Sequence, residues 1–332
     1  MHHSIRIAGL AAAAIIALGL SGCAAGSVSG GGDGPAAATP GSGTLTTITL
    51  GEFPATTFAP VHLGDTKGIF AKHGIALKYQ SGAGAAALLP GVMNGSIDVA
   101  VGNPVSVMQA AAKGLDVKII AGYNRDNPAV KDETGVIVAM PSSGITRARD
   151  LVGKKVAINT LKNSTEVVVR AAVHADGGDD TKLVFTELPF PDMPAQLQGG
   201  GVDAAFMVQP FLGPTLAHGG TIISDAQVAA GLQNLIQVTF TSANWAKKNP
   251  ELLSAFREAW TEALDYGQAH PEELRTTVPT FLPSYTQAQA AGLQFETFSA
   301  NLDRKGLQVW ADLAYKYGAL TKASELDTIV LQ

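Results

Sequence analysis

Short apolar runs of strand length alternate with stretches of helical periodicity from about residue 45 to the C-terminus. Runs that are rich in apolar or β-branched residues and bounded by turn formers are typical of strands in a covered sheet. They occur at 46–50, 75–80, 98–101, 117–121, 135–139, 156–159, 202–208 and 235–240. Helical patterns occur at 58–73, 285–300 and 303–317, and Pro250 heads a helix with an apolar stripe of Leu253, Phe256, Trp260 and Leu264. This alternation predicts an α/β fold.

The stretch 187–210 combines a loop, a short helix, a glycine turn and a buried strand. Asp192 is a suitable N-cap for the helix, which the glycines at 199–201 end. The run 202–208 then leaves the sheet at Gln209. Because ligands of such sheets bind beyond the carboxyl ends of the strands, we expect Gln209 to touch a ligand. Asp192 and Glu52 are expected near the same cleft, where they would repel an anion unless their side chains turn away.

An earlier stretch, 88–104, repeats this order of helix, glycine turn and strand, and it ends at Asn103. The repetition suggests two lobes of similar build, although any α/β protein contains such units. Asn103 either contacts a ligand or forms the turn before Pro104. Tyr123, after the strand 117–121, packs either on a ligand or in the core.

Small residues begin a helix at Gly82, Ala83 and Gly84. The spacing loosely fits a dinucleotide fingerprint, but no acidic residue closes a following strand at the required distance, so we reject that interpretation. Small residues still allow a ligand to approach the backbone, and free N–H groups at a helix start attract anions.

A second helix start is predicted at Asn163, with Ser164 and Thr165 as the next two residues. Asn163 and Glu166 have the spacing of a capping box, so capping alone explains these residues as well as a ligand does. The loop after the first strand, with Phe53 and Pro54, is expected to join Asn103 and Gln209 at the same cleft.

The N-terminus has the pattern of an export signal at 1–22, where basic residues precede an apolar run too short to span a bilayer comfortably. Leu20-Ser21-Gly22-Cys23 ends the run, and Cys23 is the only cysteine. This sequence resembles the bacterial lipobox, in which the cysteine is lipidated; the alternative is an ordinary secretory signal. Residues 24–44 have the composition of a flexible tether.

Several motifs together resemble the solute-binding proteins of ABC importers in the sulfonate/nitrate/taurine group, also called SsuA/THI5-like or NMT1-like. The residues that carry the resemblance are 59–60, 67–75, 94–100, 113–114, 150–157 and the stretch 187–210. Each motif is weak, but they occur in the order found in the family. The resemblance covers the chain from about residue 45 to its end.

This resemblance implies a two-lobed periplasmic-binding-protein fold of type II, in which two crossover segments join lobes with mostly parallel, helix-flanked sheets. The expected lobes are 45–138 plus 237–332, and 139–236. It further implies a monomer outside the cell membrane that binds a small organic anion and delivers it to a permease with its own ATPase. A thiamine-pyrimidine-type heterocycle is the alternative ligand, and a ligand sensor is the alternative role.

Composition excludes other classes. The chain has 332 residues, a net charge of −5 and no basic stripe, which argues against nucleic acid as a partner. One branch of this fold makes a pyrimidine with a cysteine-rich iron motif, which a chain with a single cysteine does not support. No catalytic motif or paired metal spacing occurs, so we expect no enzyme, no cofactor and no metal site.

Overall fold

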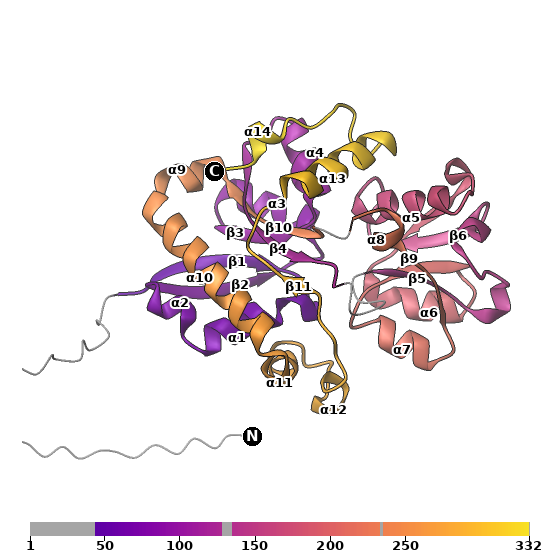
Figure 1. The fold of residues 1–332 in the computed structure, drawn as a ribbon, viewed down its shortest axis with the longest axis horizontal. Helices are drawn as coiled ribbons and strands as arrows, with labels where there is room; N and C mark the ends of the chain where they lie inside the picture. Colours follow the sequence, from indigo (N-terminus) through magenta and orange to yellow (C-terminus); the bar gives the residue numbers. More distant parts are fainter. Residues whose placement is uncertain (1–43, 128–134, 233–234, 332) are drawn as a thin grey trace, which may run out of the picture. The chain divides into compact units, whose positions relative to one another are not determined.

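The computed structural model describes residues 44–127, 135–232 and 235–331. The predicted signal peptide, Cys23 and all of the predicted tether except Thr44 lie outside these ranges. Among the described residues, no helix is both long enough and apolar enough to cross a membrane. The described chain contains two β-sheets with helices on their faces (Figure 1).

The first sheet has six strands in the order β11-β4-β10-β3-β1-β2. Strand β1 pairs in parallel with β2 and β3, whereas β10 lies antiparallel between β3 and β4. The strands are β1 Thr46–Glu52, β2 Ile75–Ser81, β3 Val99–Gly102, β4 Val117–Arg125, β10 Gln237–Ser242 and β11 Thr297–Phe298. Four of the six strands, β1 to β4, therefore share one direction.

The second sheet has five strands in the order β7-β6-β8-β5-β9. Strand β6 is parallel to β7 and β8, and only β5 runs against its neighbours. The strands are β5 Val136–Ala139, β6 Lys155–Ile158, β7 Val184–Glu187, β8 Ala204–Met207 and β9 Thr221–Asp225. In both sheets the reversed inner strand, β10 or β5, is the first strand after the chain passes from one sheet to the other.

Each sheet is covered on both faces. On the first sheet, α1 Ala59–Thr66, α2 Ile69–Lys72 and α10 Pro250–Ala269 share a core with one face, and α3 Ala85–Asn94, α4 Pro104–Ala112 and α13 Arg304–Lys316 with the other. On the second sheet, α6 Met193–Gln198 and α7 Leu212–Ala217 cover one face, and α5 Ser164–Ala175 and α8 Ala226–Ala229 the other. Burial on both faces explains why the strands are continuous apolar runs.

The remaining helices are α9 Ala243–Lys248, α11 Pro271–Phe281, α12 Gln287–Ala290 and α14 Leu326–Ile329. Short 3-10 turns occur at Thr56–Phe58, Pro141–Ser143, Ala148–Leu151, Asp180–Lys182 and Phe190–Asp192. The predicted stripe on α10 is confirmed, because its four apolar residues are buried in the core of the first sheet.

Two predicted helices are wrong in extent. The predicted helix 58–73 is divided into α1 and α2, because Gly68 adopts a left-handed conformation with φ 74°. The predicted helix 285–300 contains only α12, which a capping box of Thr286 and Gln289 begins. The residues after α12 extend instead, since β11 pairs with the end of β4 at the edge of the sheet.

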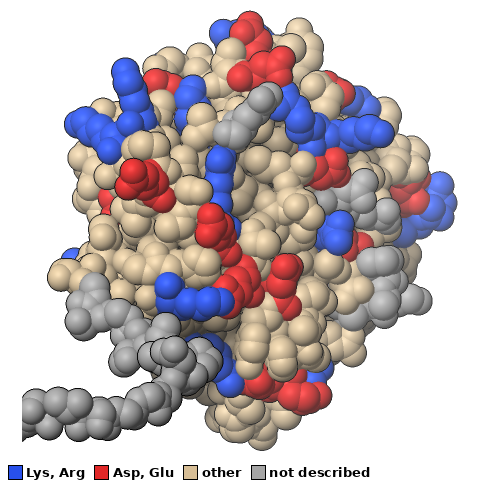
Figure 2. All heavy atoms as spheres, turned by 60° about the vertical axis from the view of Figure 1, so that its left-hand side comes forward, with Lys and Arg blue, Asp and Glu red and all other residues tan. Residues whose placement is uncertain are grey.

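Charged side chains of both signs are interspersed on the face drawn in Figure 2. Helix α10 and its neighbours carry ion pairs, among them Lys72 Nζ with Glu262 Oε1 at 2.9 Å and Lys67 Nζ with Glu273 Oε2 at 2.5 Å. Pairs as exposed as these contribute little to stability, because water and salt screen them. Stability must therefore come mainly from the apolar packing on the two sheets.

Candidate functional site

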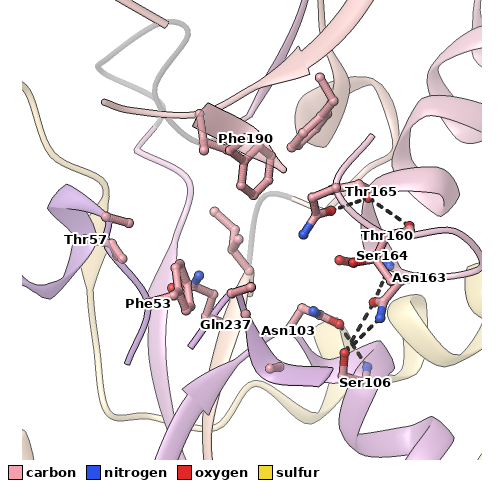
Figure 3. Close-up of a pocket in the computed structure, with 18 of the residues that line it drawn as sticks. Phe53, Thr57, Asn103, Ser106, Thr160, Asn163, Ser164, Thr165, Phe190 and Gln237 are labelled. Atoms are coloured by element: carbon pink, nitrogen blue, oxygen red, sulfur yellow. Dashed lines mark hydrogen bonds between the residues drawn. The ribbon is translucent and has the colours of Figure 1, made fainter. Parts of the chain in front are cut away.

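A cavity of about 260 Å³ lies between elements of the two sheets (Figure 3). Nine of the twelve residues predicted to bind a ligand line it: Phe53, Pro54, Ala83, Gly84, Asn103, Asn163, Ser164, Thr165 and Gln209. They come from loops at the carboxyl ends of strands and from helix starts, as the sheet rule predicts. Whether each of them contacts a ligand stays a prediction.

Three predicted site residues do not line the cavity. Gly82 extends the pairing of β2, since its N–H donates to Glu52 O at 2.8 Å, and α3 begins three residues later. Asp192 is exposed, and although it precedes α6 its side chain makes no capping hydrogen bond. The helix start predicted at Gly82 lies three residues too early, whereas the N-cap position predicted at Asp192 is correct. Neither residue lines the cavity.

Tyr123 belongs to the core. Its side chain is fully buried, and its hydroxyl donates to Thr57 O at 2.6 Å. Its ring lies 5.6 Å from that of Phe58 and 5.4 Å from that of Trp260. Because successive residues of a strand face opposite sides, the next residue, Asn124, faces the cavity instead.

Three helices begin at the cavity, and their N-cap residues Gly84, Asn103 and Asn163 line it. Asn103 Oδ1 accepts from Ser106 N at 2.9 Å, and Asn163 Oδ1 accepts from Ser164 N at 2.6 Å. Asn103 therefore caps a helix and lines the cavity at once, so its two predicted roles are compatible. The first N–H groups of a helix have no partner within the helix, and they carry partial positive charge.

The predicted capping box of Asn163 and Glu166 does not form. Glu166 Oε2 accepts from the N–H of Lys162 at 2.8 Å rather than from that of Asn163. Lys162 has φ 53°, a turn that brings its N–H back over the helix start. Glu166 is buried and also pairs with Arg170 at 2.8 Å, so the carboxylate is compensated within the helix.

Direct hydrogen bonds join elements of the two sheets beside the cavity. Asn163 Nδ2 donates to Ser106 Oγ at 3.0 Å, which links α5 to α4 (Figure 3). Gln109 Nε2 donates to Lys162 O at 2.5 Å, and Tyr285 Oη donates to Gln209 Oε1 at 3.2 Å. These contacts connect the residues that surround the cavity from both sides.

The end of the cavity at Asn124 contains hydrogen-bond acceptors, and two more line the cavity. Asn124 Nδ2 donates to Thr57 Oγ1 and to Glu296 Oε1, both at 2.9 Å. Among the described residues, Asn124 Oδ1, Gln227 Oε1 and Gln237 Oε1 are buried without a hydrogen-bond partner. Burial raises the pKa of the Glu296 carboxyl, because the interior disfavours its charged form.

No lysine, arginine or histidine is among the described residues that line the cavity, and Glu296 is the only ionisable group there. Glu52 follows the first predicted strand, but its carboxylate lies 2.9 Å from His62 Nε2 and does not line the cavity. The described residues also contain no group of three His, Cys, Asp or Glu side chains that could hold a metal ion. The cavity is thus suited to binding by hydrogen bonds and helix ends.

Sequence reasoning missed the acceptor end. Asn124 was within reach of the rule that named Asn103 and Gln209, because it also lies near the end of a strand. Glu296 offered no such signal, since it lies in a stretch with helical periodicity. Thr57, Ser106, Phe190, Gln227 and Gln237 also line the cavity, and only the packing of the two sheets places them there.

Known proteins resemble this chain. The family model described as NMT1/THI5 like matches residues 55–274. The taurine-binding periplasmic protein of Escherichia coli is 23% identical over 65% of this chain, and the match spans 66% of that relative, slightly less than two thirds.

Solved structures share the fold. The alkanesulfonate-binding protein SsuA from Xanthomonas axonopodis pv. citri, bound to MOPS, has a TM-score of 0.70 at 17% identity, covering 86% of this chain and 98% of its own. The periplasmic nitrate-binding protein NrtA from Synechocystis PCC 6803 has a TM-score of 0.70 at 16% identity, covering 86% of both chains. The two helix-flanked sheets therefore form a periplasmic-binding-protein fold.

Proposed function

The chain belongs to the NMT1/THI5-like family, and from this premise we propose that it is the solute-binding protein of an ABC importer. The cavity takes up a small organic anion, and the loaded protein delivers it to a membrane permease driven by a separate ATPase. The taurine, alkanesulfonate and nitrate named for three similar proteins support this ligand class.

The observation that carries the proposal is the meeting of three helix N-termini at one cavity. The N-caps are Gly84, Asn103 and Asn163, and each belongs to a helix of eight residues or more. Helices α3 and α4 pack on the first sheet, and α5 packs on the second. Each helix start has partial positive charge of about half an elementary charge and N–H groups that can donate to an anion. An anion can thus be held here without a lysine or arginine.

The size of the cavity supports a small solute. Its volume of about 260 Å³ lies just below the range of roughly 300–1,000 Å³ that is typical of pockets for drug-sized molecules. Rings of Phe53, Phe190, Phe206 and Phe211 form much of the apolar wall. These rings also support the alternative ligand, a flat heterocycle of the thiamine-pyrimidine type.

Binding is coupled to closure in this proposal. Residues 45–138 with 237–332 form one lobe, and 139–236 form the other. A solute that contacts α3 and α4 on one side and α5 on the other favours the closed form, because it gains contacts that the open form lacks. The Ser106–Asn163 hydrogen bond adds to this preference.

The proposed location is the outer face of the cell membrane. Cleavage before Cys23 and lipidation of its thiol would anchor the mature monomer, with residues 24–44 as a tether. The proposal contains no catalytic step and no cofactor. A sensor that presents its closed form to a receptor would use the same cavity, and an importer differs from it by transport of the solute.

A calorimetric titration tests the proposal. The protein is unfolded, dialysed and refolded to remove any bound solute, and it is then titrated with ethanesulfonate, taurine, nitrate and a thiamine pyrimidine. We expect at least one small anion to bind, and Asn163→Asp to weaken its binding by about 1,000-fold. The matched control is Asn94→Asp at the exposed far end of α3, which retains binding. If the thiamine pyrimidine binds and none of the small anions does, the proposal of an anionic ligand is rejected.

A further inference from the structure

Part of the cavity surface offers acceptors that an anion cannot use. Sulfonate and nitrate only accept hydrogen bonds, whereas the side chains of Asn124, Gln227 and Gln237 present buried oxygens without partners among the described residues. A buried acceptor without a donor costs about 1–3 kcal/mol, so native proteins rarely retain one without a reason. Several in one cavity indicate that the solute brings donors.

The orientation of Asn124 is set by its neighbours. Its amide nitrogen donates to Thr57 Oγ1 and Glu296 Oε1, which both lie at 2.9 Å, so its amide oxygen points elsewhere. Asn124 is 3% exposed and Glu296 is 9% exposed. A carboxyl group and an amide oxygen without a partner are thereby both buried at the same cavity. This pair matches a nitrogen group with several N–H donors.

Thr57 and the start of α5 lie on different sides of the cavity. Figure 3 shows Thr57 on one side and Asn163, Ser164 and Thr165 on the other. Thr57 marks the acceptor end, since it is hydrogen-bonded to Asn124. A solute that spans the cavity can therefore place unlike groups at its two ends.

We propose that the Thr57–Asn124–Glu296 cluster binds a protonated amine, so that the solute is a small zwitterion with its amine at Glu296 and its acidic group at the helix starts. This inference rests on the proposed function and adds the donor group to the ligand. An ammonium supplies three donors, which can pair with Glu296 and Asn124 Oδ1. It also compensates the buried carboxylate, which has no cationic neighbour among the described residues lining the cavity.

Matched pairs of solutes that differ only in the amine test this inference. The unsubstituted protein is titrated with taurine against ethanesulfonate, and with 3-aminopropanoate against propanoate. We expect the aminated member of at least one pair to bind about 10- to 150-fold more tightly, the range for hydrogen bonds to charged groups. Equal affinity within both pairs, or tighter binding of the members without amine, overturns the inference.

The variant Glu296→Gln then tests whether Glu296 is the residue that binds the amine. We expect this variant to lose the preference for the amine, while the affinity for ethanesulfonate stays within about threefold or improves. Ser164→Ala at the opposite end serves as the control, because it should weaken both members of a pair equally. A folded Glu296→Gln protein that retains the preference contradicts the assignment.

The result separates the inference from the function on which it rests. If small anions bind but the amine makes no difference, the inference fails and the proposed function stands. If no small acid binds, with or without an amine, both fail. Circular dichroism melts of each variant establish that it is folded, and the comparison on the unsubstituted protein needs no variant.

Discussion

The substitution Asn163→Asp should weaken anion binding strongly while it changes the free energy of unfolding little. Asn163 is 5% exposed, caps α5 through Ser164 N at 2.6 Å, and donates to Ser106 Oγ at 3.0 Å. Aspartate is as good an N-cap as asparagine, its charge suits the helix start, and the Ser106 hydroxyl can turn to donate to it. We therefore expect the free energy of unfolding to change by less than about 1 kcal/mol.

The cost to binding follows from the added charge. Two like charges about 4 Å apart repel by about 4 kcal/mol at an effective dielectric constant of 20. At 1.36 kcal/mol for each tenfold change, this corresponds to a loss of about 1,000-fold in affinity for an anion at the start of α5. Asn163→Ala should behave differently, since it removes the cap and leaves a buried hydroxyl unpaired, at a cost of roughly 2–4 kcal/mol of stability.

Urea titration measures the stability of both variants, and calorimetry measures their affinity for the solute identified by the panel. The reasoning is refuted if Asn163→Asp binds the anion as tightly as the unsubstituted protein, because the helix start would then not face the bound charge. It is also refuted if Asn163→Asp destabilises the protein as much as Asn163→Ala.

Three further predictions concern stability. Burial raises the pKa of Glu296 above 4.5 in the folded protein. Without solute, the free energy of unfolding should therefore fall as pH rises through the folded-state pKa. Urea titrations at about pH 4 and 7.5 should show this fall for the unsubstituted protein and not for Glu296→Gln, and the same fall in both would contradict the prediction. Gly102→Ala would place a Cβ 2.2 Å from the Ala85 Cβ at the start of α3, which should cost about 1–3 kcal/mol and weaken solute binding, whereas Gly292→Ala, with no atom within 4 Å, should be neutral. Phe256→Ala empties a fully buried site in the first-sheet core and should cost about 3–5 kcal/mol in urea titrations; a loss below about 1 kcal/mol would refute the packing argument.

Local features could be derived from the chain itself. The stripe on α10 buries as its spacing indicates, and Asn163 caps a helix, because both depend on residues within one or two turns. The apolar runs form strands with boundaries shifted by a few residues. The rule on strand ends also named most of the residues that line the cavity, since it requires only the position at which a strand ends.

Tertiary structure alone decided which of these ends meet. The hydrogen bond between Asn124 and Glu296 joins residues that are 172 positions apart in the chain. These two residues meet because β11 pairs with the end of β4. No short-range pattern encodes that pairing. Periodicity could not choose between Tyr123 and Asn124 either, because adjacent strand residues face opposite sides and only the packing of the sheet assigns one side to the core. Sequence therefore determined the helix starts and the strands, and the order of strands in the two sheets determined the cavity.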